Sequence, residues 1–569
     1  MRDTLTIAIV GSGGDGVVLL GSFLQKLTAE QGYFSQMPRY YGAQIRGGAS
    51  AVKLSLDAEH TCVAEDTADI LVCFDWEKYQ EVTEELPMGA DTLVLYDDNP
   101  PQGMNLPKQS FAVDFTKKSR EITGATLSKN MIALGLIKKI LALPADEVQH
   151  TIDRNEELAL LKNNVAAIAA GESLFSAFPF PDLRLSPPRN RSPKVILHGS
   201  GTMVRAAIHA NCRAFFGYPI TPAADIMQAM QEEIGQRGGV FLQAEDEIAA
   251  AGLCVGASMV GVKSITATSG PGFDLMTEMI GLAASAEIPM VIIDVQRCGP
   301  STGIPSKSEQ SDLNQAIYGG HGDAPRVVIA PYDIEGCYRL VIASLDIAQY
   351  FQTPVILLSD QWLGQTLVAA ESDFLEKDYP STDSKKPAAE EGQPYRRYQL
   401  TEDSISPMAV VGDAGLQYQT TGLTHNEMGA PAWDFETQQK MHEKRWQKLL
   451  PLCQRDDLVK LFGEPDCPAG IITWGSSAQI VRETVNALGL QHQVTVCVPE
   501  LIYPLPDMVR KFMKSVEKLL IIEMNYSGQF YHYLRSQVDV PVKTKVYARA
   551  GSRPFSKKEL SPLMMELVR

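Results

Sequence analysis

Phe216-Gly217-Tyr218-Pro219-Ile220-Thr221-Pro222 is the stretch of this chain that says most about its fold, and Glu245-Asp246-Glu247 follows downstream. Threonine before proline predicts the start of a helix, because the Thr221 hydroxyl can cap the helix and proline at the first helical position loses no hydrogen-bond donor. The free N–H groups of such a helix start bind carboxylates and phosphates. The stretch therefore indicates either an anion site or a helix start that Thr221 caps for its own sake.

Strand-like and helix-like segments alternate on both sides of this stretch. We expect strands near residues 239–243, 262–268, 289–295, 325–330 and 354–358. This alternation predicts a parallel sheet covered by helices. Because 569 residues exceed the size of one domain, the chain is expected to be a multidomain α/β protein.

Composition divides the chain into five segments. Residues 1–178 alternate strands and helices, and residues 179–193, rich in proline and arginine, are predicted to be an exposed linker. A second α/β block is expected over residues 194–365, beginning with the strand Lys194-Val195-Ile196-Leu197. Residues 366–465 are richer in charge, proline and glycine and are predicted to form an extended connecting segment. The strand–helix rhythm returns over residues 466–569, with strands at 470–475, 494–498 and 519–523.

The balance of charge and hydropathy excludes some classes of function. A formal net charge of −17 argues against a protein that binds the nucleic-acid backbone, which needs clustered lysine and arginine. No apolar run reaches the length of a membrane span. The amino terminus runs directly into the strand-like segment Thr4-Leu5-Thr6-Ile7-Ala8-Ile9-Val10, unlike a signal peptide. We therefore expect a cytoplasmic protein that engages neither nucleic acid nor a membrane.

The cysteines do not follow a metal-binding pattern. They stand at positions 62, 73, 212, 254, 298, 337, 453, 467 and 497. No two of them have the close spacing of an iron–sulfur or zinc motif. They are expected to be reduced and mostly buried, and no metal site is expected on this chain.

The glycine-rich segment Gly11-Ser12-Gly13-Gly14-Asp15-Gly16 lies between a predicted strand and a predicted helix. It matches the G-x-G-x-x-G pattern of dinucleotide-binding folds. Such a site also needs an acidic residue about 20 residues on, to hold the ribose. Residues 32–39 supply none. The segment is better interpreted as a cradle for a phosphate or carboxyl group, with a purely structural tight turn as the alternative.

Three further motifs follow the opening stretch in order. They are Thr268-Ser269-Gly270-Pro271-Gly272, the strand Pro289-Met290-Val291-Ile292-Ile293-Asp294-Val295-Gln296-Arg297, and Gly299-Pro300-Ser301-Thr302-Gly303-Ile304-Pro305-Ser306-Lys307. Together the motifs resemble the α subunit of the 2-oxoacid:ferredoxin oxidoreductases, in the 2-oxoglutarate-type branch whose γ domain is fused at the amino terminus. The resemblance spans nearly the whole chain. It implies a γ domain that covers coenzyme A, then a pyrimidine-type thiamine-diphosphate-binding domain, then a transketolase C-terminal-like domain.

The resemblance also implies a reaction and partners. Enzymes of this family oxidatively decarboxylate a 2-oxoacid with thiamine diphosphate, coenzyme A and ferredoxin. Because no cluster spacing is visible here, a 4Fe–4S cluster is expected on a β subunit. Gly14-Asp15-Gly16 lacks the asparagine that a thiamine diphosphate motif requires, so Mg²⁺ and the diphosphate are also assigned to the β subunit. A dimer of heterodimers is expected.

The family's functional residues transfer to this sequence by position. Glu247 matches the glutamate that contacts the thiamine aminopyrimidine, with Glu245 as the second choice and an idle acidic helix turn as the alternative. Arg297, Thr221 and Tyr218 are the candidates for binding the oxoacid, although Arg297 can also be a surface arginine. Gly13, Gly14, Arg39 and Arg46 are the candidates for coenzyme A, because arginine binds oxyanions through a planar fork.

The loop after Arg297 bears on which 2-oxoacid is the substrate. Thr302 and Lys307 on this loop, near Ser301, are further candidates for binding the substrate. Lys307 offers a second cation for a distal carboxylate and so favours 2-oxoglutarate over pyruvate or 2-oxoisovalerate. A non-oxidative thiamine-dependent decarboxylase and a non-catalytic assembly subunit are the alternatives of other classes. The late signature Glu523-Met524-Asn525-Tyr526-Ser527-Gly528-Gln529 also matches the family and is predicted to be a structural turn.

Overall fold

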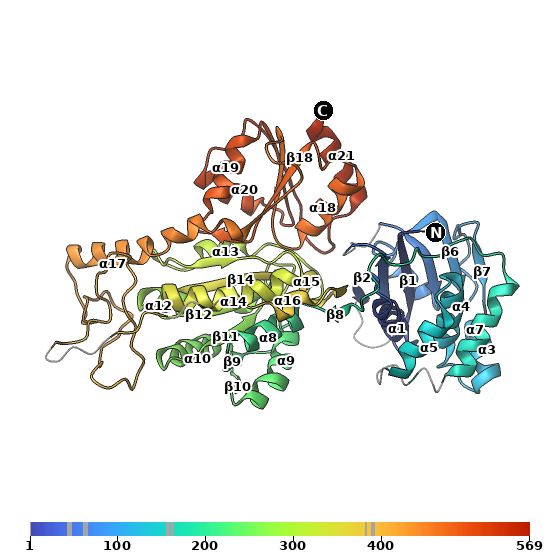
Figure 1. Cartoon of the computed structure of the whole chain (residues 1–569), viewed down its shortest axis with the longest axis horizontal. Coiled ribbons are helices and arrows are strands. Elements are labelled where there is room, and N and C mark those ends of the chain that lie inside the picture. Colours follow the sequence, from blue (N-terminus) through green and yellow to red (C-terminus); the bar gives the residue numbers. More distant parts are fainter. Residues whose placement is uncertain are drawn as a thin grey trace. The chain divides into compact units, whose positions relative to one another are not determined.

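In the computed structural model, residues 2–41, 48–60, 66–154, 160, 164–379, 381, 384–387 and 393–569 are described. The chain forms two compact units (Figure 1). Unit 1 comprises Met1–His198, Gln365–Glu376 and Ser556–Lys558. Unit 2 comprises Gly199–Gly364, Lys377–Phe555 and Glu559–Arg569.

Unit 1 is built on a nine-stranded sheet in the order β7-β6-β5-β1-β4-β2-β15-β8, with β3 paired to β4. Its strands are β1 (Thr4–Ser12), β2 (Phe34–Met37), β3 (Arg39–Tyr41), β4 (Ala49–Asp57), β5 (Ala68–Cys73), β6 (Met88–Tyr96), β7 (Ser110–Ala112), β8 (Val195–Leu197) and β15 (Leu367–Ala370). Its helices are α1 (Val17–Glu30), α2 (Trp76–Gln80), α3 (Phe115–Thr123), α4 (Lys129–Ile140), α5 (Ala145–Arg154), α7 (Val165–Ser173), α16 (Asp373–Glu376) and the 3₁₀ helix η2 (Leu174–Ala177).

The core of unit 1 lies between the sheet and the helices α1, α4 and α7, which pack beside it (Figure 1). The predicted first strand and the helix after the glycine-rich segment are confirmed by β1 and α1. Leu5, Ile7 and Ile9 alternate along β1 and are fully or almost fully buried in this core. This alternation is the pattern by which a strand directs one face into the core.

One strand expectation for the second block is wrong. The segment predicted to begin its sheet is β8, which pairs antiparallel with β15 at the edge of the unit 1 sheet. β15 in turn pairs with β2, through Leu367 opposite Met37. The strand at residues 194–197 could be predicted locally but its partner could not, because pairing depends on segments far apart in the chain.

Unit 2 contains a seven-stranded sheet in the order β10-β9-β11-β12-β14-β13-β19. Its strands are β9 (Ala214–Gly217), β10 (Val240–Gln243), β11 (Ser264–Thr268), β12 (Met290–Gln296), β13 (Val327–Ile329), β14 (Pro354–Asp360) and β19 (Leu501–Tyr503). The associated helices are α8 (Gly199–His209), α9 (Ala224–Ile234), η3 (Gly235–Arg237), α10 (Glu247–Met259), α11 (Gly270–Leu275), α12 (Thr277–Ser285), α13 (Leu313–Tyr318), α14 (Ile334–Phe351) and α15 (Gln361–Gln365).

All neighbouring strands of this sheet are parallel except β13 and β19. The five strands predicted from residues 239 to 358 are confirmed by β10, β11, β12, β13 and β14. Every residue of β12 and of β14 is buried. Continuous apolar runs are typical of parallel strands that are covered on both faces, which explains why these strands could be predicted.

A second sheet of unit 2 has the order β16-β18-β17-β20-β21. Its strands are β16 (Val459–Phe462), β17 (Ala469–Thr473), β18 (Val494–Pro499), β20 (Lys518–Glu523) and β21 (Lys543–Ala548). Around it lie α17 (Phe435–Gln447), η4 (Leu450–Gln454), η5 (Asp456–Leu458), α18 (Ser477–Ala487), α19 (Asp507–Ser515), α20 (Gln529–Gln537) and α21 (Lys557–Val568). Ile292 and Ile356 of the first sheet, Trp474 directly after β17 and Phe530 of α20 belong to one hydrophobic core.

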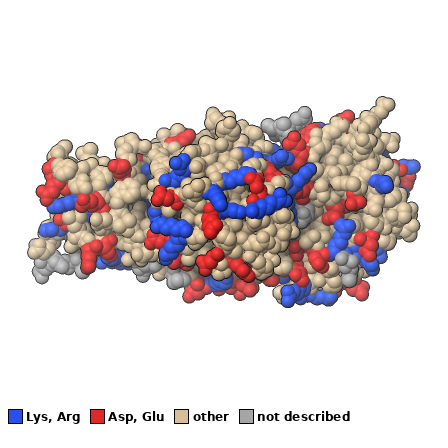
Figure 2. Space-filling view, turned by 90° about the horizontal axis from the view of Figure 1, so that it is seen from above, with Lys and Arg blue, Asp and Glu red and all other residues tan. Residues whose placement is uncertain are grey.

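The segment between α16 and α17 contains no helix or strand in its described residues, and one isolated bridge joins His425 to Pro431. Arg397, which is 1% exposed, anchors it by donating hydrogen bonds to the Glu287 carbonyl at 2.6 Å and to Gln352 Oε1 at 2.8 Å. Elsewhere at the surface, lysine and arginine side chains lie among aspartates and glutamates on the face that Figure 2 views. Within the described parts of the chain, every helix is too short or too polar to cross a bilayer.

Candidate active site at the carboxyl edge of the parallel sheet

The strands β10, β9, β11 and β12 are parallel neighbours, so the loops that follow them meet at one edge of the sheet. The chain runs from β9 to β10 on one side and returns to β11 on the other side of β9. Ligands bind α/β sheets outside the carboxyl ends of the strands at such a reversal. The predicted site residues of unit 2 lie on these loops: Tyr218 and Thr221 after β9, Glu247 after β10, and Arg297, Thr302 and Lys307 after β12.

Glu247 opens α10, and its side chain is buried. Asp246 caps this helix by accepting a hydrogen bond from the Ala249 N–H at 2.8 Å. Glu247 is 5% exposed, whereas Glu245 is exposed. A Cβ built on Gly272 would lie 2.2 Å from Glu247 Oε1, so the carboxylate rests against a glycine backbone. Of the two candidate acids, Glu247 is therefore the one that is shielded from water.

Arg297 lies directly after β12 and is 6% exposed. Its Nη1 donates a hydrogen bond to the Thr221 carbonyl at 2.6 Å, so two residues predicted to bind substrate meet in the fold. Burial lowers the pKa of Arg297, and the charge of Asp312 opposes that effect. The alternative of a solvent-exposed surface arginine is wrong.

The prediction that Thr221 caps a helix is also wrong. α9 begins at Ala224 with Ala223 at the N-cap position, and no side chain caps it. The Ala224 N–H instead donates to the Ile220 carbonyl at 2.8 Å, and this backbone bond closes a turn where the cap was expected. The Thr221–Pro222 peptide bond is cis. Thr221 and Tyr218 are exposed at this turn.

The loop after Arg297 folds back on itself. The Cys298 N–H donates to the Lys307 carbonyl and the Ile304 N–H to the Cys298 carbonyl, each at 3.0 Å. The buried Glu309 accepts a hydrogen bond from the Gly299 N–H at 3.0 Å. Thr302 and Ser301 are exposed on this loop and Lys307 is half-buried.

Sequence reasoning missed two aspartates at this edge. Asp294 is fully buried inside β12, and Asp312 lies just before α13. Burial raises the pKa of Asp294 well above its ordinary value and that of Asp312 to about 7. The sequence did contain a sign of Asp294, because a charged residue within a continuous apolar strand has no route to solvent and is unusual there.

The coenzyme A candidates lie in unit 1. The Gly13 N–H donates to the Gly48 carbonyl at 3.3 Å, and Gly14 has a φ of 108° with open space beside its α-carbon. Asp15 accepts a hydrogen bond from the Ser12 N–H at 2.8 Å, so an acidic side chain already occupies part of the glycine-rich turn. Arg39 is half-buried in β3, and Arg46 lies outside the described residues.

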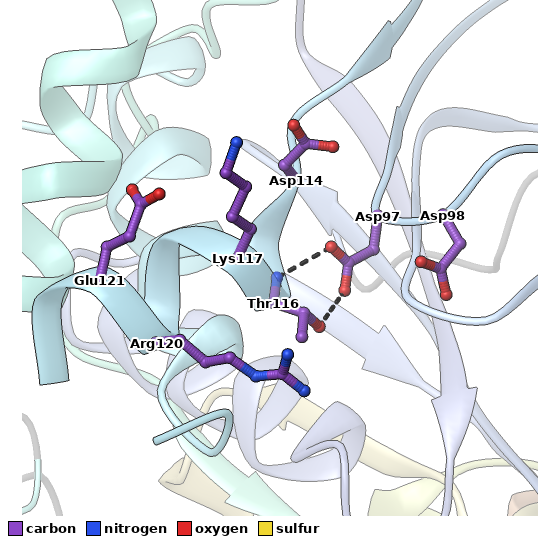
Figure 3. A pocket seen from close by; sticks show the side chains of 7 residues that line it. All are labelled: Asp97, Asp98, Asp114, Thr116, Lys117, Arg120 and Glu121. Carbon is purple, nitrogen blue, oxygen red and sulfur yellow. Dashed lines mark hydrogen bonds between the residues drawn. The ribbon is translucent and has the colours of Figure 1, made fainter. Parts of the chain in front are cut away.

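A surface cavity of about 330 Å³ lies at the carboxyl ends of β6 and β7 (Figure 3). Asp97, Asp98, Asp114, Thr116, Lys117, Arg120 and Glu121 line it. Asp97 accepts hydrogen bonds from the Thr116 N–H, at 2.8 Å, and from the Thr116 hydroxyl. Burial and then the charge of Asp97 raise the pKa of Asp98. The excess of acids disfavours a phosphorylated ligand, and the sequence-predicted coenzyme A residues are not among those that line this cavity.

Two family models cover most of the chain. The model described as "Pyruvate flavodoxin/ferredoxin oxidoreductase, thiamine diP-bdg" matches residues 205–444, which include Thr221, Glu247 and Arg297. The model described as "Pyruvate ferredoxin/flavodoxin oxidoreductase" matches residues 6–174. The class defined by fold and site is thus an oxidoreductase subunit with a thiamine-diphosphate-binding domain.

Relatives of known function agree with this class. The α subunit of 2-oxoacid:ferredoxin oxidoreductase 2 from Aeropyrum pernix is 30% identical over 78% of this chain and 73% of its own. The 2-oxoglutarate synthase subunit KorA from Archaeoglobus fulgidus is 37% identical over 59% of this chain and 88% of its own. A solved structure of 2-oxoglutarate:ferredoxin oxidoreductase from Magnetococcus marinus, with 2-oxoglutarate, coenzyme A and succinyl-CoA bound, matches all of both chains with a TM-score of 0.91 and 31% identity.

The chain belongs to the family of 2-oxoacid:ferredoxin oxidoreductase α subunits. It is a subunit of an oxidoreductase of the EC 1.2.7 type. The predicted family and the predicted multidomain α/β fold are confirmed. The roles of the individual site residues stay predictions.

Proposed function

We propose that this chain catalyses, with a β subunit, the coenzyme A-dependent oxidation of 2-oxoglutarate to succinyl-CoA and CO₂, passing two electrons to ferredoxin, or the reverse reaction. The observation that carries the proposal is the buried Arg297, hydrogen-bonded to Thr221 at the sheet edge where the buried Glu247 also lies. The KorA relatives and the ligands of the Magnetococcus marinus structure favour 2-oxoglutarate.

Glu247 fits the pyrimidine half of a thiamine diphosphate site. Its carboxylate is buried beside Gly272: a Cβ built on Gly272 would lie 2.2 Å from Glu247 Oε1 and 2.3 Å from the Thr268 hydroxyl. In that position Glu247 holds or releases a proton at the aminopyrimidine ring. Thiamine diphosphate, when bound, supplies the electron sink for decarboxylation.

Arg297 is the cation for the carboxylate beside the ketone of the substrate. Thr221 and Tyr218 border the same loop edge and supply hydroxyl groups. Lys307 and Thr302 lie on the loop after Arg297, and we assign Lys307 to the distal carboxylate of 2-oxoglutarate. A lysine is suited to this role because its ammonium is a compact point charge.

The remaining parts of the enzyme are assigned to partners and to unit 1. The β subunit is proposed to carry Mg²⁺, the diphosphate of the cofactor and a 4Fe–4S cluster, within a dimer of heterodimers in the cytoplasm. Gly13, Gly14, Arg39 and Arg46 are proposed to contact coenzyme A. Along the chain we propose the boundaries 1–178, 179–193, 194–365, 366–465 and 466–569 for the γ domain, linker, domain I, connecting segment and domain II, with β8 and β15 contributed to the sheet of unit 1.

The test is anaerobic reduction of a viologen dye by the complex purified through this chain, with coenzyme A and with 2-oxoglutarate, pyruvate or 2-oxoisovalerate offered separately. We expect coenzyme A-dependent reduction, fastest with 2-oxoglutarate. Faster reduction with pyruvate or 2-oxoisovalerate would assign that oxoacid as the substrate in place of 2-oxoglutarate. CO₂ release without dye reduction would indicate a non-oxidative decarboxylase, and no oxoacid-dependent reduction by a cluster-containing complex would overturn the proposal.

Two variants test the role of Glu247 in the same assay. Glu247→Gln keeps the shape of the side chain but cannot exchange a proton, so kcat should fall on the order of 10²- to 10⁴-fold. Glu245→Gln, which changes an exposed acid two residues away, should retain kcat. Unchanged turnover in Glu247→Gln would favour a non-catalytic assembly subunit.

A further inference from the structure

Polar groups are concentrated in the buried part of unit 2 next to Arg297. Asp294 lies in β12 between Thr268 of β11 and Leu358 of β14, and it is fully buried. Several buried polar atoms here have no hydrogen-bond partner among the described residues: Thr266 Oγ1, Ser269 Oγ, both carboxylate oxygens of Asp294, Arg297 Nε and Asp312 Oδ2. Such groups are costly to bury, so their arrangement requires an explanation.

Asp312 is held beside Asp294, because its N–H donates a hydrogen bond at 3.1 Å to Oε1 of Gln296, which stands two residues after Asp294 on the same face of β12, and the two carboxyl groups interact. An ionised carboxylate only accepts hydrogen bonds, so this contact becomes favourable when one of the two groups carries a proton. Among the described residues, no other group donates a hydrogen bond to the Asp294 carboxylate. Two negative charges so close together in a dry site cannot both persist, so the pair retains a proton.

The surroundings of the pair hold few compensating charges. Gly270 at the start of α11 approaches it closely, since a Cβ built there would lie 3.2 Å from Asp312 Oδ2. The largest influences of other charged groups on the pair come from Asp274 of α11, Glu309 and Arg297. Arg297 is the single cation of this set, so the charge of the pair acts on the guanidinium.

We propose that Asp294 and Asp312 share a proton and together form a positioning pair for Arg297, setting how much of its positive charge is available to the carboxylate of the 2-oxoacid. When both carboxyl groups are protonated, the pair is neutral and Arg297 attracts the substrate. When Asp312 loses its own proton, the pair keeps one shared proton and one negative charge, and that charge competes with the substrate for the same guanidinium. This inference rests on the proposed function, which assigns Arg297 to the substrate.

The first test measures KM and kcat for 2-oxoglutarate with the intact complex between pH 6 and pH 8.5. For the unmodified enzyme we expect KM to rise about tenfold over this range, because deprotonation places a new charge beside Arg297. In Asp312→Asn the amide donates permanently to Asp294, so KM should change less than about twofold. kcat should show no corresponding difference. Identical KM profiles for the two enzymes would overturn the proposal.

Asp274→Asn is the matched control. Asp274 is exposed and acts on the pair only through its charge. This variant should therefore keep the pH dependence of KM that the unmodified enzyme shows. Loss of the dependence in Asp274→Asn as well would indicate a general effect of removing an acid and would also overturn the proposal.

A second test reads the shared proton without using activity. The pKa of Asp312 is raised from 3.8 to about 7, so its protonated form contributes stability that is present at low pH and is lost as pH rises toward 7. The measured quantity is the thermal midpoint of Asp312→Asn minus that of the unmodified complex. This difference should therefore increase from pH 5 to pH 7 and then stay constant. A constant difference would overturn the shared proton. If this difference appears but the complex shows no oxoacid turnover, the proposed function fails, and the positioning role fails with it.

Discussion

Gly272 is the residue that leaves room for the predicted catalytic acid. A Cβ at this position would lie 2.2 Å from Glu247 Oε1 and 2.3 Å from Thr268 Oγ1, both closer than real side chains approach. Gly272→Ala should therefore displace the Glu247 carboxylate. We expect kcat in the viologen assay to fall at least about 10²-fold, because proton transfer depends on the position of the carboxylate.

Gly256→Ala is the control for that change. Gly256 lies on α10, the same helix as Glu247, and no atom lies within 4 Å of a Cβ built there. Alanine in a helix interior is more stable than glycine by roughly 0.5–1 kcal/mol, so this variant should retain kcat and unfold at a slightly higher temperature. Full activity of Gly272→Ala would show that Glu247 does not depend on this contact.

At the scale of the elements, α17 is fixed to the core of unit 2 by a buried ionic cluster. Lys444 and Lys448 contact the two oxygens of Glu287 at 2.5 and 2.9 Å, and all three side chains are at most 2% exposed. Arg397 of the connecting segment donates to the Glu287 carbonyl at 2.6 Å. Burial alone would raise the pKa of Glu287, but Lys444, Lys448 and Arg397 together hold it well below its usual value.

Glu287→Gln removes the only acid of this cluster and leaves buried cations without a counter-charge. We expect the free energy of unfolding to fall by about 3–5 kcal/mol at pH 7, measured as a lower midpoint of chemical denaturation. Because the folded-state pKa of Glu287 is lowered, its contribution is present above the unfolded-state pKa of about 4.5 and is lost as pH falls. The difference between the two proteins should therefore shrink in acid.

Glu436→Gln supplies the control on the same helix. Glu436 pairs with Lys440 at 2.5 Å, but their side chains are 76% and 51% exposed. An exposed pair of this kind contributes about 0–1 kcal/mol, so its loss should hardly move the midpoint. Equal effects of Glu287→Gln and Glu436→Gln would mean that the buried cluster does not stabilise the fold.

Another element-scale prediction from the sequence is confirmed in the late signature. Glu523 at the end of β20 accepts hydrogen bonds from the N–H groups of Phe530 and Tyr531, at 2.7 and 3.0 Å, and from Asn525 Nδ2 at 2.6 Å. Gln529 Nε2 donates to the Ser311 carbonyl at 2.7 Å. The signature is thus a structural turn that also fixes the loop before α13.

At the scale of the whole molecule, the sequence predicted features that are encoded locally. β12 could be predicted because its apolar run is continuous. Arg297 could be selected as a candidate site residue because it directly follows that strand. The contact between Asp294 and Asp312 could not be predicted, since it depends on how the loop before α13 returns to the sheet. β15 was missed because its partner β2 lies more than 300 residues earlier. Short strands such as β19, with three residues, carry too little pattern to be recognised.

This long-range pairing gives a prediction for the architecture of unit 1. A fragment of residues 1–193 lacks both β8 and β15 and exposes the edge of β2, which favours aggregation. Leu197 lies opposite Val368, so β8 ends where β15 begins and a turn of two to four residues can join residue 198 to residue 365.

The joined fragment, residues 1–198 followed by 365–376, should therefore be monomeric and more stable than fragment 1–193. We expect a gain on the order of 3 kcal/mol in urea denaturation, because Leu197, Val368 and Ala369 become buried again. Ala369→Asp in the joined fragment places a charge at a fully buried position and should abolish the gain. If fragment 1–193 were equally stable and monomeric, the strands contributed from beyond residue 193 would not be needed to complete the sheet.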